Sequence, residues 1–167
     1  AKHYKTGAPM PQPLVDKMKK AGKFNSGYDM TELVSAALLD MNWHTLGARE
    51  QIPEADAFEA AALKNAKTDL SYVPPRYRSS YFQHIWGNGY AAGYYAYLWT
   101  EMLADDAFIG FKDHGGLTRE NGDRFRAMVL SRGNTEELAK MYKAWRGQDP
   151  SIEPMLENRG LKEGAKK

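Results

Sequence analysis

The clearest pattern of hydrophobic and polar positions lies between Met30 and Met41, where apolar residues return every three or four positions. This spacing places them on one face of an α-helix, because a helix completes a turn in about 3.6 residues. We expect Ser26 or Asp29 to cap this helix and Gly47 to end it. The segment is therefore predicted to bury one face against the rest of the protein.

Similar periodicity, with proline and glycine at the boundaries, predicts several further helices. They cover residues 14–21, a segment that opens at Pro53, residues 90 to about 112, residues 118–130, a segment opened by the capping box 134–137, and residues 152–158. No convincing alternation of period two, which is typical of strands, appears outside residues 79–86. We therefore predict an all-α fold.

Composition narrows the class of protein. The chain has 167 residues, no cysteine and a net charge of +2, so thiolate metal sites and cysteine nucleophiles are excluded, and neither nucleic acid nor a membrane surface is indicated as a partner. No apolar run reaches the ~18 residues of a membrane span, and the first residues lack the apolar core of a signal peptide. The sequence also lacks an initiator methionine, so we expect a piece of a longer protein or a processed product.

Catalytic and metal motifs of familiar spacing are absent from the sequence. The four histidines His3, His44, His84 and His114 are too far apart to form a pair on one helix turn, so no metal site is predicted within this chain. No serine lies in a nucleophile elbow. The sequence therefore offers neither a resident metal nor a conventional nucleophile.

The unusual segment is 82–99, which is rich in tyrosine, glycine and alanine. Two interpretations are open: the tyrosines anchor a tight helix–helix contact, or their hydroxyls donate hydrogen bonds to a developing oxyanion. Tyr90 and Tyr97 are about 10 Å apart along a continuous helix. Their hydroxyls can meet only if Tyr90 belongs to a loop, which the glycines at 87 and 89 permit. His84 is a candidate for a third donor.

Several blocks of this sequence resemble, in order, the C-terminal catalytic region of the thimet oligopeptidase/neurolysin family of zinc metallopeptidases. Its bacterial peptidyl-dipeptidase branch is the more similar one. The blocks are His84 with the tyrosines that follow it, and residues 36–41, 73–82, 94–99, 102–106, 115–122 and 130–134. The resemblance covers nearly the whole chain, apart from the last few residues.

This resemblance implies the C-terminal helical portion of a two-lobed fold with a deep substrate channel. We expect residues 1–161 to form a fragment of the catalytic domain and residues 162–167 a polar tail. The family's zinc is held by an H-E-x-x-H motif and a downstream glutamate, which this sequence lacks. The resemblance therefore implies zinc in the full-length enzyme and none bound by residues of this chain.

The resemblance also implies roles for individual residues. Tyr90 and Tyr97 correspond to tyrosines that stabilise the tetrahedral intermediate, and His84 to a histidine that binds the substrate backbone. Tyr94 and Gly89 are carried over as residues that line the channel. These five residues are the predicted catalytic and substrate-binding positions.

Two arginines are further candidates for substrate binding, on chemical grounds alone. Arg76 and Arg78 could grip the C-terminal carboxylate of a peptide, which an enzyme that removes C-terminal dipeptides must recognise. Ordinary surface ion pairs are the competing interpretation for both.

The resulting hypothesis is a cytoplasmic zinc peptidase that removes C-terminal dipeptides from oligopeptides, with the periplasm as the alternative location. This chain alone should be inactive. Its expected partners are the oligopeptide substrate and the missing N-terminal part of the same protein, and self-association is also expected. The alternative function is a non-catalytic helical module for peptide binding or assembly.

Overall fold

A computed structural model describes residues 2–51 and 54–162 of the chain. Within these ranges the regular elements are helical, and an isolated bridge between Lys2 and Pro9 is the one extended pairing, so the predicted all-α class is confirmed. None of the described helices is both long enough and apolar enough to cross a membrane. The elements are α1 Gln12–Ala21, α2 Ser26–His44, α3 Ala55–Asn65, the 3₁₀ turn η1 Ser79–Tyr81, α4 Gln83–Gly87, α5 Ala96–Asp113, α6 Arg119–Phe125, the π-helical η2 Arg126–Leu130, α7 Leu138–Arg146 and α8 Glu153–Arg159.

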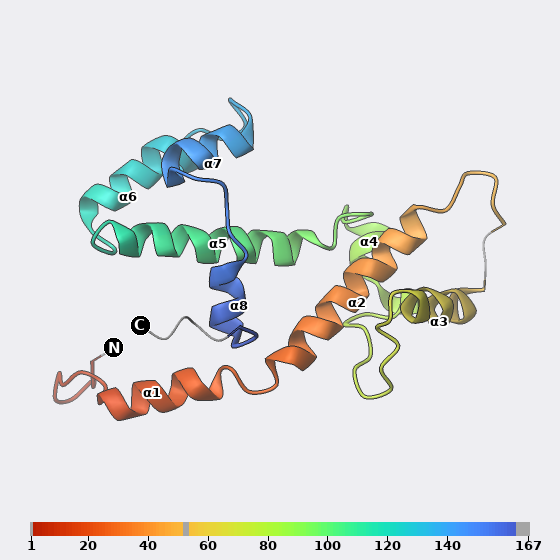
Figure 1. Cartoon of the computed structure of the whole chain (residues 1–167), viewed down its shortest axis with the longest axis horizontal. Coiled ribbons are helices and arrows are strands. Elements are labelled where there is room, and N and C mark those ends of the chain that lie inside the picture. The colour runs from red at the N-terminus through yellow and green to blue at the C-terminus, as the bar shows by residue number, and fades with distance from the viewer. Residues whose placement is uncertain (1, 52–53, 163–167) are drawn as a thin grey trace.

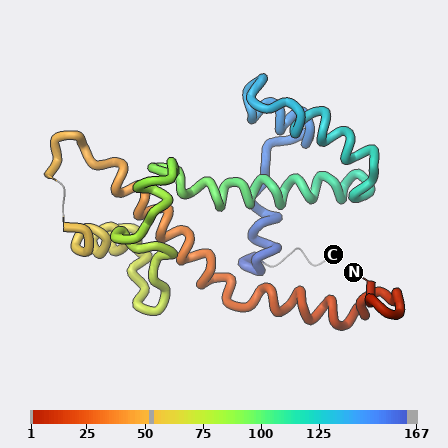
Figure 2. Tube along the Cα trace, turned by 180° about the vertical axis from the view of Figure 1, so that it is seen from behind, coloured from red at the N-terminus to blue at the C-terminus, as the bar shows by residue number. Residues whose placement is uncertain are grey.

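The helices form two packed groups that α5 connects (Figure 1). In the first group α3 packs against α2 and against η1. In the second, η2 continues α6 and packs against α7, and α8 packs across α5. The helix α1 runs away from the start of α2, as the trace in Figure 2 also shows. The chain is therefore extended, with a small core in each group.

The core of the first group lies where α2 meets residues 82–94. Ala36 and Ala37 of α2 are buried against Phe82, Ile85 and Tyr94. The two alanines are small, so they allow the aromatic side chains to approach the helix closely, and dense packing of this kind stabilises the fold. This core fixes the position of the segment that holds the predicted site.

The second core joins α5 to α6 and α7. The ring of Trp145 lies 5.6 Å from that of Phe111 and 4.8 Å from that of Phe125. Next to these rings the buried carboxylate of Asp106 accepts a 2.7 Å hydrogen bond from the Tyr142 hydroxyl. Apolar packing and a buried acid with a hydrogen-bond partner thus hold α5, α6 and α7 together.

The helix α8 links the two groups through charged contacts. Arg159 donates two hydrogen bonds, of 2.7 and 2.6 Å, to the carboxylate of Glu101 on α5. Lys23, between α1 and α2, donates a 2.8 Å bond to the carbonyl of Glu157. A bidentate arginine–carboxylate pair is among the stronger polar contacts in proteins, so α8 fixes α5 to the start of α2.

The helix boundaries agree with the sequence in several places. Thr118 caps α6 by accepting a hydrogen bond from the Asn121 amide. Gly147 ends α7 with a φ of +85°, a conformation that glycine adopts without steric cost. The predicted start of a helix at Pro53 lies outside the described residues, and Glu54 caps α3.

Two predicted helix starts were wrong. Glu137, not Asn134, caps α7, because its carboxylate accepts from the amides of Ala139 and Lys140. Neither Ser26 nor Asp29 caps α2, since Asn25 occupies that position with a φ of +57° and makes no capping hydrogen bond through its side chain. Local polar residues compete for these positions, and the path of the preceding chain decides between them.

The buried face of α2 also differs from the predicted stripe. Leu38 and Met41 are exposed, whereas Ser35, Leu39 and Asp40 are buried. The reason is that α2 packs against α3 and also against residues 82–94, so its covered surface is wider than one apolar stripe and includes polar positions.

We expect Trp145→Ala to lower the free energy of unfolding by about 3–5 kcal/mol, because it empties the second core. Trp145 is 3% exposed. The matched control is Trp99→Ala on α5, where the side chain is 54% exposed and the loss should stay within about 0.5 kcal/mol. Urea unfolding followed by circular dichroism measures both. Equal losses would contradict the second core.

Candidate active site

The residues before α5 form a turn rather than the predicted start of that helix. The Tyr90 amide donates a 3.1 Å hydrogen bond to the carbonyl of His84, and the Gly93 amide donates a 2.8 Å bond to the carbonyl of Tyr90. Ala92 has a φ of +53°, which no helical residue adopts. The helix begins at Ala96, so Tyr90 lies in a loop, as the oxyanion interpretation requires.

This turn brings Tyr90 against Tyr97. Their ring centres are 5.4 Å apart and their planes differ by only 9°. The ring of His84 lies 5.8 Å from that of Tyr90 and 6.1 Å from that of Tyr97. The structure therefore brings together the three side chains that the sequence picked out as catalytic candidates.

The ring of His84 carries an unsatisfied polar atom. Among the described residues its Nδ1 is buried and has no hydrogen-bond partner. A buried polar atom without a partner is costly, and such atoms in native proteins often mark a site where a ligand completes the bonding. The His84 side chain as a whole is partly exposed, so the rest of its ring can meet a polar group beside the two tyrosines.

A buried aromatic layer supports these three side chains from below. Tyr94 is only 4% exposed, whereas Tyr97 is 42% exposed. The ring of Tyr94 lies 5.1 Å from that of Tyr97 and 5.4 Å from that of His84. Tyr77 also contacts His84, at 4.8 Å between ring centres. Sequence reasoning missed Tyr77, whose only signal was its place in an aromatic, proline-rich break.

The phenols of Tyr94 and Tyr97 remain protonated at neutral pH. Burial, reinforced by Tyr77, raises the pKa of Tyr94 to about 12. The hydroxyl of Tyr90, with a further contribution from burial, raises the pKa of Tyr97 above its ordinary value. A protonated phenol donates a hydrogen bond, so Tyr97 is suited to an oxygen that gains negative charge.

The remaining sequence candidates lie at different distances from this cluster. Gly89 has a φ of +79° in the same turn, and the space where a Cβ would stand is open. The guanidinium of Arg76 lies 5.8 Å from the ring centre of Tyr77, and its nearest carboxylate oxygen, on Glu32, is 3.8 Å away. Gly89 and Arg76 therefore border the cluster.

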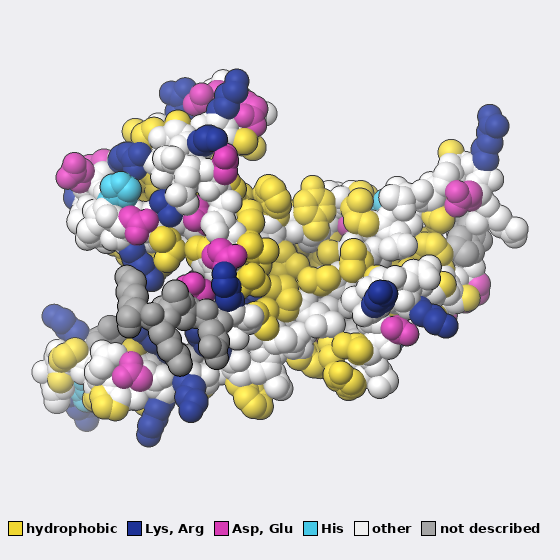
Figure 3. All heavy atoms as spheres, in the orientation of Figure 1, with side chains coloured by type: hydrophobic (Ala, Val, Ile, Leu, Met, Phe, Trp, Pro, Cys, Tyr) yellow, Lys and Arg dark blue, Asp and Glu magenta, His cyan; other side chains and the backbone are white. Residues whose placement is uncertain are grey.

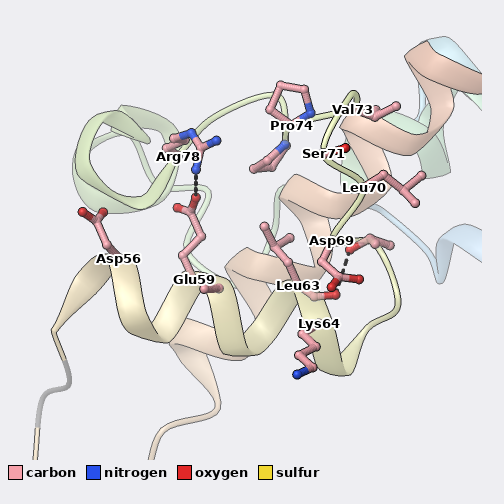
Figure 4. A pocket seen from close by; sticks show the side chains of 13 residues that line it. Asp56, Glu59, Leu63, Lys64, Asp69, Leu70, Ser71, Val73, Pro74 and Arg78 are labelled. Atoms are coloured by element: carbon pink, nitrogen blue, oxygen red, sulfur yellow. Dashed lines mark hydrogen bonds and ion pairs between the residues drawn. The ribbon is translucent and has the colours of Figure 1, made fainter.

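Arg78 faces another part of the surface. Its Nη1 donates a 2.8 Å hydrogen bond to the buried carboxylate of Glu59, in a cavity of about 640 Å³ between α3 and residues 68–78 (Figure 4). The same carboxylate accepts bonds from the amide and hydroxyl of Ser79. Neither His84 nor a tyrosine of the cluster lines this cavity. The structure thus separates the two arginines.

Metal binding finds no support in the described part of the chain. Between residues 2 and 51 and between 54 and 162, no three histidine, aspartate or glutamate side chains are grouped so that they could hold a metal ion. His44 pairs with Asp40, and aromatic rings surround His84. The resemblance places the zinc of the full-length enzyme on residues outside this chain, and neither histidine is grouped with other metal ligands in the described residues.

Comparison with known proteins decides the family. Residues 1–161 match the model of peptidase family M3. The chain belongs to this family. Among its M3 relatives, the dipeptidyl carboxypeptidases of Escherichia coli (strain K12) and Salmonella typhimurium are 60% and 58% identical over 161 residues, which is 96% of this chain and 24% of each relative. Oligopeptidase A of Escherichia coli is 37% identical over 163 residues, covering 23% of that protein. The chain thus spans about a quarter of the length of these M3 relatives, and the expected family is confirmed.

The raised pKa of Tyr94 predicts a loss of stability in alkaline solution. Below about pH 10 the phenol is protonated in the folded and the unfolded chain, so it adds no pH dependence. Between pH 10 and about 12 the unfolded chain releases this proton and the folded chain keeps it, so the free energy of unfolding falls as pH rises.

Tyr94→Phe should therefore make this fall less steep, as urea unfolding between pH 9 and 12 would measure. The control is the same substitution at the exposed neighbour Tyr95, measured in parallel. A fall in Tyr94→Phe as steep as in the wild type would contradict the burial of this phenol.

Proposed function

We propose that this chain is part of a zinc-dependent M3 peptidase that removes C-terminal dipeptides from oligopeptides, within a two-lobed fold. The observation that carries the proposal is the convergence of Tyr90, Tyr97 and His84 on one face of the first group of helices. The names of the most similar relatives support the choice of reaction, since two of them are dipeptidyl carboxypeptidases.

The chemistry of this chain is the stabilisation of charge on the substrate. When water adds to a peptide carbonyl, the carbonyl oxygen becomes negative, and phenol donors already in place lower the energy of that state. The rings of Tyr90 and Tyr97 are stacked, and the Tyr90 hydroxyl is close enough to raise the pKa of Tyr97. We assign them as the two donors.

His84 binds the substrate beside these donors. Its side chain is partly exposed, so the ring can contact a backbone group of the peptide. Gly89 lines the substrate path with an open backbone position. Tyr94 forms the floor of this path, because its buried ring lies directly beneath Tyr97 and His84.

The two arginines are proposed to contact the C-terminal carboxylate of the peptide, and Arg76 is the better placed. It lies next to Tyr77 in the aromatic layer and is half exposed. Arg78 already donates to Glu59, so it would have to exchange that buried partner for the substrate. We therefore rank Arg76 above Arg78 for this contact.

The zinc of this proposal belongs to the full-length protein. The sequence has no H-E-x-x-H motif, and the described residues hold no metal cluster. We assign no catalytic step of this chain to the metal. The chain binds, orients and donates hydrogen bonds, and it lacks the groups that would activate water.

The proposed partners are the peptide and the rest of the M3 polypeptide, and the chain alone is expected to self-associate. Large apolar side chains gather along α5 and toward α2 in Figure 3. Tyr81, Trp86, Tyr95 and Trp99 are each at least half exposed. Contiguous apolar surface of this kind favours association. For location we propose the cytoplasm.

We expect this chain, purified alone and supplied with zinc, to show no hydrolysis of oligopeptides, because it lacks a metal site and a general base. The measurement is mass spectrometry of peptide products over hours. Addition of the remaining part of a dipeptidyl carboxypeptidase as a separate chain is the positive control. Release of C-terminal dipeptides by this chain alone would contradict the proposal.

In the full-length peptidase, Tyr97→Phe should lower kcat by about 10²–10³-fold and change KM little, because one donor to the developing oxyanion is lost. Tyr95→Phe is the matched control, since Tyr95 is a neighbouring exposed tyrosine outside the stack. Steady-state kinetics with a chromogenic peptide measures both variants. An unchanged kcat in Tyr97→Phe would remove this residue from the proposed role.

A further inference from the structure

A buried acid on α2 contacts the backbone of the tyrosine turn. The side chain of Asp40 is fully buried. Its Oδ1 accepts a 2.9 Å hydrogen bond from the amide of Ala92, and its Oδ2 accepts a 2.9 Å bond from the amide of Tyr94. One carboxylate thus binds two amides that lie more than 50 residues away in sequence.

These amides lie in the turn, four and two residues before Ala96, the first residue of α5. The first amides of a helix have no acceptors within the helix, and a negative charge near them is favourable because of the helix dipole. The residue in the capping position, Tyr95, makes no capping bond through its side chain. The first amides of α5 donate to carbonyls of residues 93–95, so Asp40 binds the turn that leads into α5 and not the helix itself.

A histidine on the same helix contacts the Asp40 carboxylate. The Nδ1 of His44 lies 2.8 Å from Oδ1 of Asp40, one helix turn away. A buried carboxylate is tolerated when hydrogen bonds satisfy it, as the two backbone amides do here. The arrangement leaves Asp40 as an acceptor that points at the turn.

The geometry of the turn determines whether the tyrosines meet. If residues 90–95 continued α5, Tyr90 and Tyr97 would be separated by about 10 Å along the helix axis. With the amides of Ala92 and Tyr94 bound to Asp40, Ala92 holds a φ of +53° and Tyr90 folds back onto Tyr97. The contact to Asp40 and the stacking thus belong to one conformation.

We propose that Asp40 is a positioning residue for the active site: its carboxylate fixes the turn at residues 90–95 so that Tyr90 and Tyr97 face the substrate together. The catalytic part of this inference rests on the proposed function, whereas the structural part does not. Asp40 itself touches no substrate, because it is enclosed between α2 and the turn.

The direct test compares two buried aspartates. Asp40→Asn keeps the size of the side chain but removes its charge and one of its two acceptor oxygens. Asp106→Asn makes the same change at the buried acid of the second group, which contacts Tyr142 and not the turn. Both variants are made in the whole chain with tyrosine labelled at Cζ, and NMR follows the ionisation of Tyr97, assigned with Tyr97→Phe.

In Asp40→Asn the pKa of Tyr97 should fall toward its ordinary value near ~10, because Tyr90 leaves the stack. In Asp106→Asn the pKa of Tyr97 should equal that of the wild type. A folded Asp40→Asn chain with an unchanged pKa of Tyr97 would overturn the proposal, and so would an equal fall in both variants.

A second measurement needs no variant, so it tests the contact between Asp40 and the turn even if Asp40→Asn does not fold. In the wild-type chain the amides of Ala92 and Tyr94 should exchange with deuterium at least about tenfold more slowly than that of Ala91. Among the described residues the Ala91 amide has no hydrogen-bond acceptor. If the amides of Ala92 and Tyr94 exchange as fast as the amide of Ala91, the proposal is overturned.

The kinetic arm separates this inference from the proposed function. In the full-length peptidase, Asp40→Asn should lower kcat by at least about tenfold with little change in KM, and Asp106→Asn should not. A changed Tyr97 pKa with unchanged kcat in Asp40→Asn would keep Asp40 as an anchor of the turn but overturn its catalytic role. Loss of kcat in both variants alike would also overturn that role.

Discussion

The rest of the site depends on one buried carboxylate. In place of water, the Asp40 carboxylate contacts two backbone amides and a histidine, at distances between 2.8 and 2.9 Å. Because a buried charge without partners is very costly, the turn and α2 can pack only in the arrangement that satisfies it. That arrangement stops α5 short of Tyr90. The stack of Tyr90 on Tyr97 and their contact with His84 follow from it.

The fold around this contact is built from two small cores rather than one large one. Phe82 and Tyr94 pack on α2 in the first, and Trp145 packs between α5 and α6 in the second. Much aromatic surface between the cores stays exposed, which agrees with a chain that spans about a quarter of its M3 relatives. The tyrosine cluster therefore has a rigid base, while its outer side is free to meet a peptide or the rest of the polypeptide.

Local signals in the sequence predicted much of this architecture. The helices predicted from periodicity appear in the structure, and the need for Tyr90 to lie in a loop could be derived from its spacing to Tyr97. The role of Asp40 could not be predicted, because its partners are 52 and 54 residues away and their amides carry no signal of their own. The same limit explains why Tyr77 and the true cap Glu137 were missed, since long-range packing and the path of the preceding chain select them.

The central claim is that a turn, and not a continuous helix, presents Tyr90 to Tyr97. Nuclear Overhauser effects between tyrosine rings in the wild-type chain test it most directly, with each ring assigned by a tyrosine-to-phenylalanine substitution. The account predicts contacts between the ring protons of Tyr90 and those of both Tyr97 and His84, at the ring separations of 5.4 and 5.8 Å. Contacts of Tyr90 with Tyr94 alone, the neighbour one turn along a continuous helix, together with none to Tyr97, would contradict it.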